Sequence, residues 1–178
     1  MIEGLTHVAG WLAIALLLTS LAISLASRWL LEQRARLIAW RRLAGLGSAG
    51  MALLHALLAL SLLGLPSAEV ITAVSALPYL RHGALALALL AALALTSFPK
   101  LNARLGLRTW SVLHRAVHVI GVLAALHVLA GPSADPRLAV IVAIAFGLLL
   151  LARLAPRARR DGGTEAPGVL TKESADNP

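Results

Sequence analysis

The chain has 178 residues, of which 59% are hydrophobic and only 13% are charged. A soluble domain of this size does not carry such long uncharged runs, and runs of about twenty apolar residues are typical of membrane-spanning helices. The net charge of +8 comes from arginines that cluster between the apolar runs, which indicates a role in membrane topology and argues against nucleic-acid binding. The composition therefore predicts an all-α integral membrane protein.

Five apolar stretches follow one another along the chain, and we expect them to form a bundle of five transmembrane helices. The stretches are Leu5 to Ala26, Leu43 to about Leu65, about Pro78 to Phe98, Thr109–Trp110 to Gly131–Pro132, and Leu138 to Leu151. Residues 1–154 are thus expected to be one transmembrane domain. The tail over residues 155–178 is first basic and then polar, without apolar periodicity, so we expect it to be disordered.

The positions of the charged residues predict the orientation in the membrane. Segments 28–42 and 100–108 and the tail are basic, whereas the 65–77 and 131–137 connections carry Glu69, Asp135 and a single Arg137. Because basic segments stay on the cytoplasmic side, we expect the N-terminus outside and the C-terminus in the cytoplasm. The start of the chain lacks the basic region of a secretory signal, so the first stretch is expected to be a retained helix.

Three histidines lie inside the apolar stretches, namely His55, His114 and His127. An ionisable side chain within a membrane helix is costly and by default marks a functional site, and imidazole is the usual protein ligand for buried iron or heme. Because the chain has no cysteine, thiolate-bound clusters and covalently attached heme are excluded, so a heme would be held as heme b. The alternatives are a helix–helix hydrogen bond for His55 and a lipid headgroup contact for His114.

His114 and His127 lie on the same predicted helix, 13 residues apart (127 − 114). This spacing corresponds to about 20 Å along the axis and places them on faces about 140° apart. They therefore need not serve one cofactor, and a kink would be required to point both inward. Depth alone does not decide which of the two pairs with His55. The other histidines, His7, His82 and His118, are expected to pack, contact water or lie near the membrane boundary.

Several short motifs occur in order along the chain. They are Thr6–His7–Val8–Ala9–Gly10, Arg41–Arg42–Leu43–Ala44–Gly45–Leu46, Leu54–His55, Pro78–Tyr79 with Gly83, Leu95–Thr96–Ser97, Arg104–Leu105–Gly106 with Trp110, Leu113–His114–Arg115, and His127. With these motifs the chain resembles the ferric reductase-like transmembrane family over roughly residues 5–130, and in particular the heme-binding membrane subunits of bacterial periplasmic protein-methionine-sulfoxide reductase systems.

The resemblance implies a b-type cytochrome subunit in the bacterial inner membrane, with no substrate-converting site of its own. Such a subunit receives electrons from a cytosolic flavin reductase or the quinone pool. It passes them to a periplasmic molybdenum-cofactor reductase that repairs oxidised methionine. The resemblance also implies FMN as a second cofactor. The alternatives are a quinone-linked cytochrome b or ferric reductase-type subunit of another complex, or a transporter component whose histidines relay protons.

The resemblance also implies which residues bind the cofactors. In the wider family two histidines on each of two helices usually ligate two stacked hemes. Here Arg42 stands 13 residues before His55 (55 − 42), so the resemblance pairs His55 with His127 as ligands of one heme iron. His114 then loses its standard partner and is a candidate for a second site. Arg115 is a candidate contact for a flavin phosphate, a quinone headgroup or the propionates of a second heme, and the alternative is that it reaches a lipid phosphate. The chain departs from the family at His118, where tyrosine is usual, and at Leu77, where arginine is common. The family generally has a further N-terminal helix, which we do not expect among the five stretches of this chain.

Overall fold

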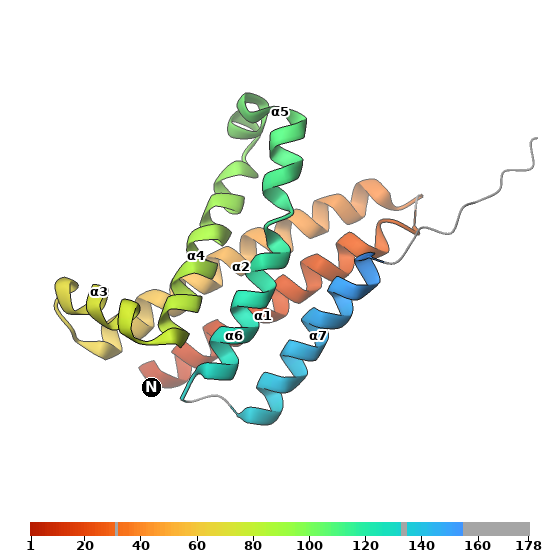
Figure 1. The fold of residues 1–178 in the computed structure, drawn as a ribbon. Coiled ribbons are helices and arrows are strands. Elements are labelled where there is room, and N and C mark those ends of the chain that lie inside the picture. Colours follow the sequence, from red (N-terminus) through yellow and green to blue (C-terminus); the bar gives the residue numbers. More distant parts are fainter. Residues whose placement is uncertain (31, 133–134, 155–178) are drawn as a thin grey trace, which may run out of the picture.

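The computed structural model describes residues 1–30, 32–132 and 135–154, and these form seven helices without a strand (Figure 1). They are α1 (Ile2–Ala26), α2 (Arg34–Leu63), α3 (Ser67–Ala76), α4 (Pro78–Thr96), α5 (Pro99–His114), α6 (Val117–Ala130) and α7 (Pro136–Leu154). Five helical spans are long and apolar enough to cross a bilayer: α1, α2, α4, the Arg108–Ala130 stretch and α7. The prediction of an all-α membrane protein with five spans is confirmed. The tail predicted to be disordered lies outside the described residues.

A short helix, α3, occupies the segment between the second and third spans, where the sequence analysis expected only a connection. Glu69 lies in its first turn, where a negative charge complements the helix dipole. The helix ends at Leu77, whose extended backbone (φ −97°, ψ 114°) is the conformation that a following proline favours. Proline spacing and one acidic residue therefore define this helix.

The helix α5 is broken at Gly106, whose φ of 72° and ψ of 155° are not helical. A residue with a side chain rarely adopts this conformation, whereas glycine does so readily. The part before Gly106 is a short helix that starts with Pro99, and the part after it begins the fourth span. This span is interrupted again by a turn at Arg115 and Ala116, which separates the helix that ends at His114 from the helix that carries His127.

The helices pack as two pairs, α1 with α2 and α4 with α6, while α7 contacts both α6 and α1 (Figure 1). By contrast, α2 and α6 have no extended contact with each other. Ser48 of α2 is buried and donates a hydrogen bond to the carbonyl oxygen of Ala13 in α1, at 2.8 Å. The core consists mainly of apolar residues from α1, α4, α6 and α7: Leu17, Leu21, Ala86, Leu90, Leu93, Ile120, Ala125, Val142 and Phe146.

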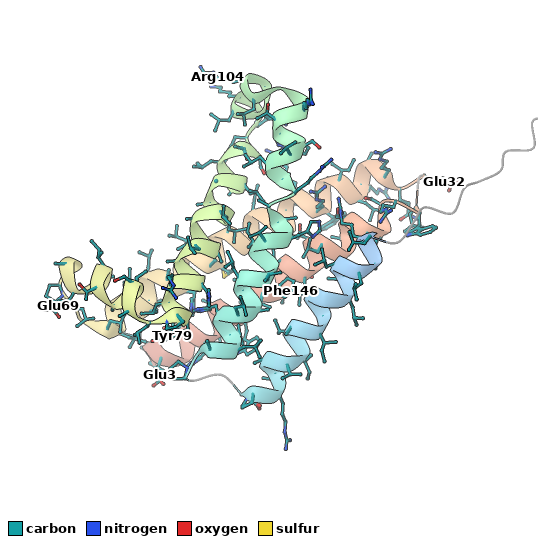
Figure 2. The ribbon with its side chains drawn as sticks, viewed as in Figure 1. Glu3, Glu32, Glu69, Tyr79, Arg104 and Phe146 are labelled. Carbon is teal, nitrogen blue, oxygen red and sulfur yellow. The ribbon has the colours of Figure 1, made fainter. Side chains whose placement is uncertain are left out.

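The two ends of the bundle differ in the elements they carry. The N-terminus, α3 and the start of α7 lie at one end, which we call the N-terminal end (Figure 1). The end of α1, the starts of α2 and α5 and the end of α7 lie away from it, at what we call the basic end. Figure 2 shows Glu3, Glu69 and Tyr79 at the N-terminal end, and Glu32 and Arg104 far from it. That the basic end faces the cytoplasm stays a prediction from the arginine distribution.

Candidate functional site

His55 of α2 and His127 of α6 come together in the half of the bundle nearest the N-terminal end. Their ring centroids lie 6.1 Å apart and their ring planes are nearly perpendicular, at 82°. Both side chains are half-buried, and the Tyr79 ring lies 6.2 Å from that of His127. Because the backbones of α2 and α6 have no extended contact, these side chains connect two otherwise separate helices.

Each of the two imidazole rings is bonded to a backbone carbonyl of the neighbouring helix. Nδ1 of His55 lies 2.8 Å from the carbonyl oxygen of Thr6 in α1, and Nδ1 of His127 lies 2.7 Å from that of Tyr79 in α4. A carbonyl oxygen only accepts hydrogen bonds, so Nδ1 carries a proton in both rings and Nε2 is the nitrogen left to bind a metal. This is the form in which histidine binds a metal, with a carbonyl contact that fixes the orientation of the ring.

Each ring also lies against a glycine, four residues after the accepting carbonyl. A Cβ atom at Gly10 would stand 2.9 Å from Nδ1 of His55, and one at Gly83 would stand 2.8 Å from Nδ1 of His127. Contacts this short essentially do not occur for real Cβ atoms, so a side chain at either position would displace the ring. Both glycines belong to the family motifs, but the sequence alone gave them no role in the site. The four-residue spacing shared by Thr6–Gly10 and Tyr79–Gly83 is the pattern that could have indicated this role.

His114 lies in a different environment, nearer the basic end. Its Nε2 atom is 3.5 Å from the hydroxyl oxygen of Thr96, and its ring centroid is 4.2 Å from that of Trp110. Arg115 is exposed in the turn after α5, and its side chain forms no hydrogen bond within the described part of the chain. The cofactor-binding roles of His114 and Arg115 therefore stay predictions.

Arg41 belongs to the basic segment and to one of the family motifs, and sequence reasoning assigned it no role in a site. The structure places it in α2, half-buried and within electrostatic range of His114, His118 and Arg153. Arg153 in turn donates a hydrogen bond to the hydroxyl oxygen of Ser24, at 2.7 Å. The basic end thus gathers several cationic groups around the fourth span. His118, expected to pack or contact water, lines an apolar groove of about 220 Å³ between α1, α6 and α7 that does not include His55 or His127.

The fold and the site together define a multi-pass helical membrane protein with a pair of metal-competent histidines. Residues 9–125 match the family described as ferric reductase like transmembrane component. The chain is 36% identical over 154 residues to the protein-methionine-sulfoxide reductase heme-binding subunit MsrQ of Klebsiella pneumoniae, covering 83% of this chain and 73% of that protein. It is 34% identical over 167 residues to the subunit of the same name from Yersinia pseudotuberculosis, covering 89% of this chain and 79% of that protein.

The chain therefore belongs to the ferric reductase-like transmembrane family, and its relatives carry the name of the MsrQ subunits. The family assignment made from the ordered motifs is confirmed.

Proposed function

We propose that this chain is a b-type cytochrome subunit that carries electrons across the bacterial inner membrane for a protein-methionine-sulfoxide reductase. The observation that carries the proposal is the arrangement of His55 and His127, with both Nδ1 atoms bonded to carbonyls and the ring centroids 6.1 Å apart. The names of the related subunits, which specify heme binding and protein-methionine-sulfoxide reductase, support the same function.

The two histidines fit the iron of a heme. A metal ion bound by two imidazoles at about 2.0 Å each separates the ring centroids by roughly 6 Å, which agrees with the observed spacing. The described residues contain no cluster of three or more histidine, cysteine or carboxylate side chains that could hold a metal ion. A heme iron needs only two protein ligands because the porphyrin fills its other positions.

A bound heme supplies a one-electron redox centre. Two histidine ligands leave no open coordination position on the iron, so the site is suited to electron transfer and not to oxygen activation. The chain's own residues set its properties. The carbonyls of Thr6 and Tyr79 hold the Nδ1 protons and raise the basicity of the ligands, and Gly10 and Gly83 fix the ring positions.

We also propose the direction of transfer and the partners. The histidine pair lies near the N-terminal end, which the arginine distribution assigns to the periplasm. A periplasmic molybdenum-cofactor reductase would accept electrons there. The donor, a cytosolic flavin reductase or the quinone pool, would act at the basic end, where we place FMN near His114 and Arg115. Arginine is suited to the FMN phosphate, and Arg41 adds positive charge beside His114.

The test is a reduced-minus-oxidised spectrum of the detergent-purified protein, with pyridine hemochrome quantitation. We expect a b-type α-band at about one heme per chain, and loss of the bis-imidazole signal in His55→Ala and in His127→Ala. His7→Ala is the control, because His7 is exposed and its Nδ1 contacts Glu3 of its own helix. Retention of the bis-imidazole signal in either ligand variant would contradict the proposed pair. Flavin analysis of the same preparation tests FMN, and reoxidation of the reduced protein by the periplasmic reductase tests the partner.

A further inference from the structure

A third histidine, His82 of α4, lies within electrostatic range of His127. Its Nδ1 atom is buried and has no hydrogen-bond partner among the described residues. Buried polar atoms in native proteins are almost always hydrogen-bonded, so an orphaned one needs an explanation. From the sequence, His82 was expected to lie near the membrane boundary, because charge and depth do not show whether a side-chain nitrogen is buried.

The register of α1 and α4 shows which way position 82 faces. Thr6 and Gly10 of α1 match Tyr79 and Gly83 of α4, so His82 occupies the position that Ala9 occupies in α1. Ala9 is only 3% exposed. In α4, Ala86 and Leu90 continue the same face into the core, four and eight residues after position 82. His82 is half-buried, and it adds an imidazole with a buried Nδ1 atom to one of two otherwise equivalent helical supports.

Within residues 1–30, 32–132 and 135–154, no carboxylate accepts a hydrogen bond from Nδ1 of His82. The acidic side chains of the described residues are all exposed, and none bonds to this histidine: Glu3, Glu32, Glu69 and Asp135. A heme brings its own acceptors, because it carries propionate carboxylates along one edge. A hydrogen bond to a carboxylate is stronger than one between neutral groups.

We propose that His82 is a positioning residue whose Nδ1–H group donates a hydrogen bond to a propionate of the heme held by His55 and His127. This inference rests on the proposed function. This contact would restrain the rotation of a heme held by His55 and His127. His82 would contact the edge of the cofactor, whereas His55 and His127 would bind the iron.

The test compares His82→Leu with His82→Asn in the full chain, purified with heme in detergent. Asparagine places an amide nitrogen close to the position of Nδ1 and retains the donor, whereas leucine removes it. The measurements are the rate of heme transfer to excess apomyoglobin, the resonance Raman band of propionate bending, and the visible spectrum. His7→Leu is the control, because the Nδ1 atom of His7 lies 3.0 Å from the carbonyl oxygen of Glu3.

We expect His82→Leu to keep the bis-imidazole spectrum, to shift the propionate band and to release heme about tenfold faster, as for the loss of one charge-assisted hydrogen bond. His82→Asn and His7→Leu should match the unmodified protein. An unchanged rate and band in His82→Leu would overturn the inference, as would His82→Asn behaving like His82→Leu. Loss of the bis-imidazole spectrum in His82→Leu would overturn it as well, since His82 would then be a ligand. An unmodified protein without heme would overturn the proposed function itself.

Discussion

Gly83 lies directly against the ring of His127, so that a Cβ atom at this glycine would stand 2.8 Å from Nδ1 and 2.9 Å from Cε1. Gly10 has the same relation to His55, at 2.9 Å and 3.1 Å. Both glycines follow an accepting carbonyl by one helical turn, so the ring contact and the hydrogen bond come from a single short motif. Two helices far apart in the sequence thus support two histidines in the same way.

The first prediction concerns these glycines. In Gly83→Ala the new methyl group would push the ring of His127 away from the Tyr79 carbonyl, and Gly10→Ala would do the same to His55. We expect each variant to bind heme about tenfold more weakly, as for the loss of one hydrogen bond with its packing. Heme titration of the apoprotein measures this.

The matched control for the glycine variants is Gly50→Ala in α2, since a Cβ atom at Gly50 would meet nothing within 4 Å. Alanine is also the better helix former, so this change should leave heme binding intact. Wild-type affinity in both Gly10→Ala and Gly83→Ala would show that neither histidine needs its observed position.

The second prediction is that His114→Ala retains the heme content of the unmodified protein. His114 is oriented by Thr96 and Trp110 and not by the carbonyl–glycine motif that supports the other two histidines. Pyridine hemochrome quantitation per chain measures the effect. A content reduced to about half would instead assign His114 to a second heme.

The third prediction concerns the contact between α1 and α2. Ser48 is 1% exposed and donates to the Ala13 carbonyl, so Ser48→Ala should lower the free energy of unfolding by about 0.5–1.5 kcal/mol. Denaturant titration in detergent, followed by circular dichroism, measures this. Ser61→Ala is the control, because Ser61 is exposed and bonds within its own helix to Leu58. Equal effects of the two changes would argue against the interhelical hydrogen bond.

The fourth prediction concerns the contact between α6 and α7. A Cβ atom at Gly121 would lie 2.8 Å from Cδ1 of Phe146, which is itself buried, so Gly121→Ala should destabilise the protein by about 1–3 kcal/mol. Gly147→Ala is the control, because a Cβ atom at Gly147 would meet nothing within 4 Å, and this change should leave the free energy of unfolding unaltered. In a Phe146→Ala background the penalty at Gly121 should disappear, because the clashing ring is gone. Persistence of the penalty there would place its cause elsewhere.

Much of the fold follows from the sequence alone. The apolar stretches locate the five spans because the thickness of the bilayer sets the length of an uncharged run. The helix after Pro66 and the break at Gly106 were not predicted, since short helices depend on local backbone conformation more than on composition. The fourth span also has a turn at Arg115 and Ala116, between His114 and His127, and the sequence did not place this turn.

The candidate site was predictable only in part. The resemblance to the family selected His55 and His127, whereas depth alone could not, because their proximity depends on how α1, α2, α4 and α6 pack. The carbonyls of Thr6 and Tyr79 are invisible in a sequence, since every residue carries a carbonyl. The burial of Nδ1 of His82 likewise depends on which face of α4 packs inward, which the sequence does not show.

The pairing of α1 with α2 and of α4 with α6 has a consequence for assembly. Each pair already contains one histidine, its accepting carbonyl and its glycine, so each pair orients its own imidazole without help from the other. Between the pairs, α2 packs on α4 and α7 packs on both α1 and α6, whereas α2 and α6 have no extended contact. A metal-centred cofactor bound by both histidines would therefore add a cross-link between the two pairs, at the place where their facing helices do not pack on each other.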